Sequence, residues 1–329
     1  MKRREFITLL GGAAAWPLAA RAQQGERMRR VGVLMSFGES DPQIKARVAA
    51  FREGLQKLGW TESRNIQIDA RWAPHVESLE QSAKELVALQ PDVILSATTP
   101  TTAALLQQTH TIPIIMAAVS DPVGDRFVAS LPRPGGNVTG FLNLEASMSG
   151  KWLELLKEIA PRVARVAAVF NPTMAPGGGS YFLGPFTAAA PSFGLEGIAA
   201  PVHDISALES VIAAQTREPN GGLVVMPDTF TTAHRADFTS LAARYHLPAV
   251  YPFRFFAEVG GLLSYGNDQH DNYLRAASYA DRILNGAKPS ELPVQAPVKF
   301  ELVINLKTAK TLGLDVPLHL QQRADEVIE

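Results

Sequence analysis

Short apolar runs alternate with amphipathic segments along the chain, and this alternation constrains the fold more than any other feature. The runs Arg30–Met35 and Asp92–Ser96 are typical of buried strands. Between them, Asp41-Pro42 combines a helix N-cap with a following proline, and apolar residues then recur every three or four positions from 44 to 58. Strands that alternate with helices predict βαβ units, so we expect parallel sheets with helices on both faces.

The same alternation restarts after Phe141, which predicts a second α/β lobe. Arg165–Phe170 and Gly222–Met226 are further strand candidates. Pro- and Gly-rich segments separate the halves, and Asn137–Gly140 is the expected start of the first crossing between them. The predicted fold class is therefore α/β, with two doubly wound parallel-sheet lobes joined by a three-segment hinge. The expected lobes are residues 28–138 with 263–294, and residues 139–262 with 295–329.

Polar residues follow several predicted strands. Because the carboxyl ends of parallel strands meet at one sheet edge, these residues and the free N–H groups of helix N-termini should gather there and favour an anion such as a carboxylate. Thr99 and Asp121 fit this role and fit simple helix capping equally well. Asp228 is the best candidate for pairing with a ligand ammonium group, and capping of the helix near Thr231 is an equally weighted alternative. Five aromatic residues can form an apolar wall or pack in the cores: Phe37, Phe141, Tyr251, Phe253 and Tyr265.

The composition excludes several functional classes. The chain has no cysteine, which rules out disulfides, thiol catalysis and cysteine-ligated metals. The seven histidines are scattered without metal-ligand spacing, so we expect no metal and no cofactor. The net charge of -1 lacks the basic surplus usual for nucleic-acid or membrane binding. The segment Ala175–Gly179 has no Lys-Ser or Lys-Thr pair after it, which favours a flexible surface loop over a phosphate cradle.

The N-terminus has the pattern of an export signal. Lys2-Arg3-Arg4 precedes the apolar body Thr8–Ala20, which is shorter than the ~20 apolar residues of a membrane-spanning helix. Ala20-Arg21-Ala22 places small residues at the two positions that a signal peptidase recognises. We therefore expect residues 1–22 to be a twin-arginine-type signal peptide, cleaved near Ala22, and the protein to be periplasmic. A frayed apolar terminus is the alternative.

Several segments resemble one known family. They are Asp121-Pro122-Val123, Leu131–Gly140, Phe300–Lys310 and Arg323–Ile328. With them the chain resembles the substrate-binding proteins of bacterial ABC importers, in the cysteine-poor branch with amino-acid and aromatic ligands. The resemblance implies a periplasmic-binding-protein type I fold that closes on its ligand.

The resemblance also implies a function and a set of site residues. The ligand would be an amino acid, including an aromatic one, or a related carboxylate, and the partner an ABC permease in the inner membrane. We expect a monomer without enzymatic activity. Tyr251 would lie near the cleft mouth. The expected ligand-binding residues are Thr98, Thr99 and Ser120 in the first lobe and Asn171, Asp228 and Tyr251 in the second.

Two other functions remain open on the sequence. One is a ligand sensor for a membrane receptor, which would use the same fold without transport. The other is a periplasmic hydrolase or lyase with Asp121 or Asp228 as the base. No histidine lies close to either aspartate in sequence to orient it, which weakly disfavours the enzyme because partners can be distant in the chain.

Overall fold

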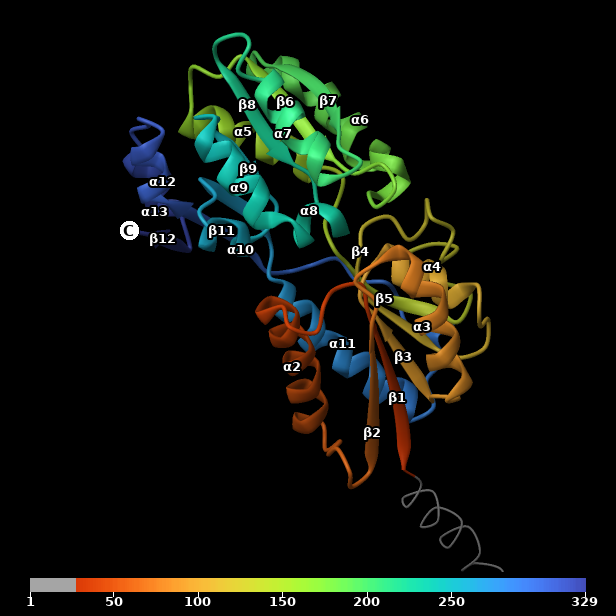
Figure 1. Ribbon diagram of the computed structural model, residues 1–329. Helices are drawn as coiled ribbons and strands as arrows, with labels where there is room; N and C mark the ends of the chain where they lie inside the picture. Colours follow the sequence, from red (N-terminus) through yellow and green to blue (C-terminus); the bar gives the residue numbers. More distant parts are fainter. Residues whose placement is uncertain (1–27) are drawn as a thin grey trace, which may run out of the picture.

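The computed structural model describes residues 28–329, which form two α/β lobes, each built on one sheet (Figure 1). The first sheet has five parallel strands in the order β2-β1-β3-β4-β5. The second has seven strands in the order β12-β11-β10-β9-β8-β6-β7, and its only antiparallel pair in the described range is β10 with β11. The predicted fold class is thus confirmed, whereas the predicted signal peptide lies outside the described residues.

Lobe 1 carries helices on both faces of its sheet. Its strands are β1 (Arg29–Met35), β2 (Ile66–Trp72), β3 (Val93–Ser96), β4 (Ile114–Val119) and β5 (Val138–Leu142). Its helices are α2 (Pro42–Lys57), α3 (Val76–Ala88), α4 (Thr99–Leu106) and α11 (Gln269–Leu284). Successive strand residues point to opposite faces. Val33 therefore packs in one core with Phe51 of α2, and Leu34 packs in another with Leu86 of α3.

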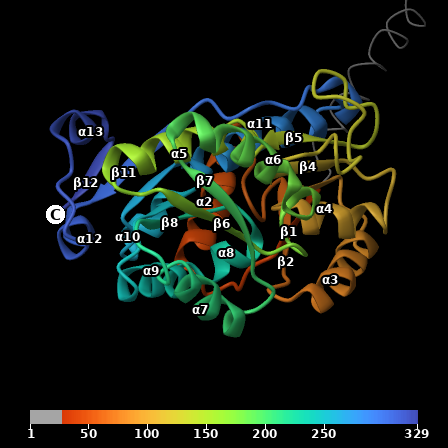
Figure 2. The same ribbon diagram turned by 90° about the horizontal axis from the view of Figure 1, so that it is seen from above.

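Lobe 2 has the same layered arrangement around a wider sheet. Its strands are β6 (Arg165–Phe170), β7 (Glu196–Pro201), β8 (Gly221–Val225), β9 (Ala249–Tyr251), β10 (Leu263–Asn267), β11 (Phe300–Asn305) and β12 (Glu326–Ile328). Its helices are α5 (Met148–Ile159), α6 (Ser180–Ala189), α7 (Ile205–Ala214), α8 (Thr229–Ala233), α9 (Arg235–Arg244), α10 (Arg254–Glu258), α12 (Leu306–Thr311) and α13 (Leu318–Arg323). Figures 1 and 2 both show α12, α13 and β12 at the outer end of this lobe, away from α3 and α4.

The strands change sheet a few residues later than the sequence-based boundaries. Residues 139–142 belong to β5, which pairs with β4 of the first sheet, and residues 263–267 belong to β10, which pairs with β9 and β11 of the second. Gln295 still pairs with Phe141 of β5. Proline and glycine content marked the crossings, but composition does not reveal which strand a segment pairs with, and this explains the offset.

Gly140 lies within β5 and not at the point where the chain crosses between the lobes. Its φ is +141°, and a Cβ atom there would lie 2.1 Å from the carbonyl oxygen of Met116 in β4. Only glycine fits such a close approach of two backbones. The expected hinge start, Asn137–Gly140, is therefore a tightly paired part of the first sheet, and the chain leaves lobe 1 between Leu142 and Met148.

Candidate ligand-binding cleft

A cavity with an empty volume of ≈ 430 Å³ lies between the two lobes. The residues that line it come from both lobes and follow the carboxyl ends of strands, as expected for a ligand edge in open α/β sheets. Eight lining residues, each after a different strand, are Phe37, Thr98, Ser120, Asn143, Met174, Asp228, Phe253 and Gln269.

The lobe 1 wall is built of hydroxyl groups around the start of α4. Thr98 is the N-cap of this helix, and its backbone amide donates to Thr101 Oγ1 at 2.8 Å. The Thr98 hydroxyl lies 2.9 Å from Ser36 Oγ, which follows β1. Ser120, which follows β4, is buried, and Thr99 also lines the cavity. Thr98, Thr99 and Ser120 are thus brought together at one wall of the cavity.

Asp228 is the acidic residue in the lobe 2 wall of the cavity. It caps α8, because its Oδ1 accepts from the amide of Thr231 at 2.7 Å, and its Oδ2 accepts from the amide of Asn171 at 2.9 Å. The hydroxyl of Thr231 and the amide of Phe230 also lie near this carboxyl group. The residue is only 8% exposed, and this burial raises its pKa to about 7 against the opposing effect of these hydrogen-bond donors. The capping alternative therefore holds, and the same side chain also faces the cavity.

Asn171 lies one step behind the cavity. Its side-chain Oδ1 accepts from the amides of Thr173 and Met174, and its Nδ2 donates to the carbonyl of His203. Its own amide holds Asp228. The side chain is buried and does not line the cavity, so the structure gives Asn171 a supporting place rather than a wall position.

Tyr251 is placed differently from the expectation that it lies near the cleft mouth. Its side chain is 1% exposed and stacks on Phe256 with the ring centroids 5.1 Å apart, inside the core of lobe 2. Side chains alternate between the two faces of a strand, and the end position of β9 alone did not reveal which face Tyr251 takes. Phe253, two residues later, lines the cavity instead.

Sequence reasoning missed Arg47, which lines the cavity from α2. It is 6% exposed, and its guanidinium carbon lies 5.9 Å from the ring centroid of Phe37 and 5.3 Å from that of Phe255. Burial lowers the pKa of this arginine. A signal was present, because position 47 is three residues after Ile44 and four before Phe51, on the buried face of α2.

Two further elements close the cavity. Gln269, at the start of α11, donates from Nε2 to Asn143 Oδ1 at 2.6 Å and so links two of the three crossings. Within the segment Ala175–Gly179, expected to be a flexible surface loop, residues Pro176–Gly179 form a short 3-10 turn in which Pro176 is buried and lines the cavity. Pro176 is therefore part of the cavity wall.

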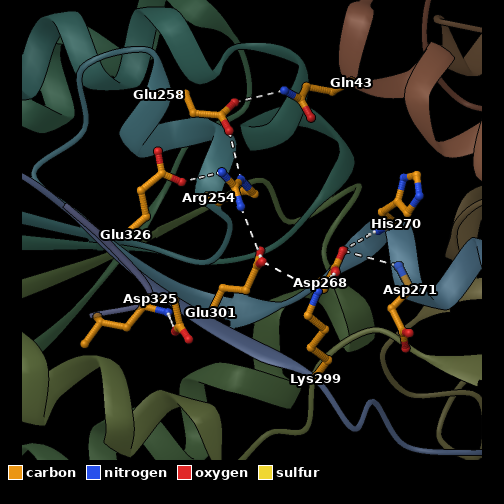
Figure 3. A network of polar contacts seen from close by, with 11 residues as sticks. Gln43, Arg254, Glu258, Asp268, His270, Asp271, Lys299, Glu301, Asp325 and Glu326 are labelled. Carbon is orange, nitrogen blue, oxygen red and sulfur yellow. Dashed lines mark hydrogen bonds and ion pairs between the residues drawn. The ribbon is translucent and has the colours of Figure 1, made fainter. Parts of the chain in front are cut away.

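The lobes touch each other beside the cavity. Asp41, the N-cap of α2, pairs with Arg235 of α9 at 2.8 Å. Figure 3 shows Gln43 donating to Glu258 at 2.9 Å, and Glu258 in turn pairs with Arg254. We call the Asp41–Arg235 and Gln43–Glu258 contacts the α2 bridge. They hold the N-terminal turn of α2 against lobe 2.

Metal and membrane features add little to the site. Among residues 28–329, no group of three or more histidine, aspartate or glutamate side chains is arranged to hold a metal ion. No helix in this part of the chain has the length and apolar character needed to cross a bilayer.

Two doubly wound lobes with a cavity between them define the type I periplasmic-binding-protein-like fold, and solved structures of that fold are similar to this chain. The chain belongs to the family of ABC transporter substrate binding proteins, whose model matches residues 31–328. The resemblance found in the sequence is confirmed. The protein is therefore a substrate-binding protein of ABC transport and not an enzyme.

Relatives with known ligands or known states support this assignment. A tyrosine-binding protein of Clostridioides difficile is 26% identical over 277 residues, which cover 83% of this chain and 78% of the relative. An ABC domain from Streptococcus pneumonia, solved in complex with L-Trp, is 28% identical with a TM-score of 0.84, over 91% of this chain and 99% of that chain. The open, ligand-free structure of a Clostridium difficile substrate-binding protein with adhesive properties has a TM-score of 0.69 at 22% identity, over 92% and 99% of the two chains.

Proposed function

We propose that the protein captures one α-amino acid, with an aromatic side chain as the first candidate, between its two lobes. The observation that carries this proposal is the buried carboxylate of Asp228 in the cavity wall of lobe 2, opposite the hydroxyl wall of lobe 1. An ammonium group supplies the positive charge that a buried carboxylate lacks. The hydroxyls at the start of α4 suit the carboxylate of the same ligand.

The other walls of the cavity support an aromatic side chain. Phe37 of lobe 1 and Phe253 of lobe 2 both line it, and Phe253 stacks on Phe255 with the centroids 5.2 Å apart. Aromatic pairs contribute about 0.5–1.5 kcal/mol beyond the burial of apolar area. One relative is named for tyrosine, and another was solved with L-Trp. A ligand that contacts both lobes stabilises the closed arrangement, because it has no such contacts when the lobes are apart.

We further propose that the protein acts in the periplasm as a monomer and delivers its ligand to an inner-membrane ABC permease. The twin arginine and apolar body of residues 1–22 support export, and the family assignment supports the permease. Mass spectrometry of the protein from a periplasmic extract should give a mature chain that starts at Gln23. An uncleaved chain retained in the cytoplasm would contradict this location.

A thermal-shift screen tests the ligand class. The panel contains the standard L-amino acids, their D-enantiomers, aromatic carboxylates and polyols. We expect an aromatic L-amino acid to raise the melting temperature and to be recovered unchanged. At a ligand concentration of 100 times Kd, the stabilisation should be about 2.7 kcal/mol. Stabilisation by polyols alone, or turnover of the ligand, would contradict the proposal.

A further inference from the structure

Arg47 is a buried cation at the boundary of the cleft. Its side chain lines the cavity between the lobes and also a second cavity of ≈ 430 Å³ beside it, which Gln43 and Phe255 help to line. Phe37 and Phe255 lie near the guanidinium group. Aromatic rings attract the charge through their faces, but they accept none of the five N–H donors in the guanidinium plane.

One buried donor of Arg47 is left without a partner by the part of the chain that the structure describes. Its Nη2 is buried and has no hydrogen-bond partner among residues 28–329. Asp41 is near enough to favour the charged form, but its Oδ2 pairs with Arg235 at 2.8 Å and its Oδ1 accepts from the amide of Gln43 at 2.9 Å. The hydroxyl of Tyr273 also lies close enough to Arg47 to favour its charged form, but it is a neutral phenol whose pKa is raised to about 12 by burial. The charge of Arg47 therefore lacks a carboxylate of its own.

A buried cation without an anionic partner is costly, and arginine cannot avoid the cost by losing its proton under ordinary conditions. An anion that enters the cavity removes this cost by completing the ion pair. A carboxylate suits best, because its two oxygens match the guanidinium fork. Neutral hydroxyls such as those of Thr98 and Ser120 accept and donate hydrogen bonds, but they do not distinguish an anion from a carboxamide by charge.

We propose that Arg47 binds the carboxylate of the ligand and makes the protein selective for carboxylate-bearing ligands over neutral ones; this rests on the amino-acid binding proposed above. Arg47 belongs to lobe 1 and Asp228 to lobe 2, and both line the same cavity. The two lobes thus present opposite charges to one ligand. A zwitterion that lies across the cavity satisfies both buried groups at once.

The test measures three ligands against three proteins by calorimetry. The ligands are L-tyrosine, L-tyrosinamide, which has a neutral amide in place of the carboxylate, and hydroxyphenylpropionate, which lacks the amine. The proteins are wild type, Arg47→Met and Asp228→Asn. Wild type should prefer L-tyrosine to L-tyrosinamide by about 10- to 100-fold, the range of a charge-assisted hydrogen bond. In Arg47→Met this preference should fall below about threefold, because the charge that produces it is gone.

Asp228→Asn should give the complementary result. It should keep the preference for L-tyrosine over L-tyrosinamide and lose the preference for L-tyrosine over hydroxyphenylpropionate. Arg52→Met is the matched control, because Arg52 lies on the same helix with its side chain 45% exposed. An unchanged preference for carboxylate over amide in Arg47→Met, with a folded protein, would overturn the proposal.

Two further measurements keep the outcomes distinct. If Arg47→Met does not fold, Arg47→Lys is used; lysine lacks the planar fork, so the carboxylate preference should fall about three- to tenfold, and no change would overturn the proposal. If wild type binds none of the three ligands, the amino-acid proposal fails, and Arg47 is tested by thermal shift with simple mono- and dicarboxylates. A carboxylate whose effect disappears in Arg47→Met supports the role of Arg47, and the absence of any such carboxylate overturns it.

Discussion

Thr98 of lobe 1 and Asp228 of lobe 2 occupy matching positions with different chemistry. Each follows a parallel strand, caps a helix and has nearly the same backbone conformation, with φ/ψ of −146°/174° and −147°/173°. In each case the threonine three residues later accepts from the amide of the cap, Thr101 at 2.8 Å and Thr231 at 3.2 Å. The same N-cap backbone conformation thus occurs in both lobes. The cap side chain is a neutral hydroxyl in lobe 1 and a carboxyl group in lobe 2.

The two walls of the cavity carry side chains of opposite charge type. Lobe 2 places a buried acid at the cavity, whereas lobe 1 places hydroxyl groups and the guanidinium of Arg47 there. An uncharged ligand forms no ion pair with these groups, whereas a zwitterion can pair with both of them in one orientation only. The repeated α/β fold therefore places a helix cap at the cavity in each lobe, and the residue type at each cap determines which ligand group it can bind.

Replacing Asp228 by asparagine should have the largest effect on binding. The substitution keeps the size of the side chain and removes its charge, so affinity for amine-bearing ligands should fall by about 100-fold, the upper range for a hydrogen bond to a charged group. Thr98→Val, at the matching neutral cap, should cost about tenfold at most. Calorimetric titration of both variants with one amino acid checks this. Equal losses of affinity in the two variants would contradict the proposed difference between the two caps.

Stability should also distinguish the caps. Asp228→Ala leaves the amides of Asn171 and Thr231 without their acceptor, so we expect a loss of about 2 kcal/mol in the free energy of unfolding. Thr98→Ala should cost about 1 kcal/mol, because its hydroxyl contacts Ser36 and not two buried amides. Urea unfolding measures both values. A larger loss at Thr98 would contradict the assignment of Asp228 as the stronger cap.

The pH dependence of binding should follow Asp228. Its pKa is raised to about 7 by burial, so the carboxyl is largely neutral below this pH and cannot pair with an ammonium group. Affinity should fall about tenfold from about pH 8 to about pH 6, and Asp228→Asn should show no such fall. For the ligand-free protein, the stability contributed by the neutral acid is complete below its ordinary pKa of 3.8 and is lost as the pH rises through about 7. Ligand titrations and urea unfolding between about pH 4 and about pH 8 check the direction of both changes, in affinity and in stability.

The α2 bridge should have the smallest effect. Arg235→Met removes the ion pair with Asp41 between the lobes, and affinity should fall about two- to fivefold, as expected for a pair worth up to about 1 kcal/mol. Both partners are partly exposed, so high salt should reduce the difference from wild type. A loss comparable to that of Asp228→Asn would mean that the bridge, and not the cavity, controls ligand capture.

Much of the fold and part of the cleft were predictable from sequence. Alternating strands and helices specified two parallel-sheet lobes. The rule that ligands bind at strand ends pointed to four residues that line the cavity, and their contact with a ligand stays a prediction: Thr98, Thr99, Ser120 and Asp228. Tyr251 shows the limit of that rule, because a strand end does not show which face a side chain takes. Arg47 was missed because helix positions are usually judged by their apolar residues, and a charged residue on the buried face was not weighed. The errors at Tyr251 and Arg47 both concern side-chain direction, which depends on packing between segments far apart in the chain.

Proton release on binding tests the central claim most directly. When a ligand ammonium group pairs with Asp228, the carboxyl must lose the proton that burial holds on it near pH 7. Calorimetry of an aromatic amino acid in two buffers with different ionisation enthalpies counts these protons. At about pH 7 the account predicts release of about half a proton per ligand bound by wild type and none by Asp228→Asn. Binding without proton release in wild type, or equal release in the variant, would contradict the pairing of the ligand ammonium with Asp228.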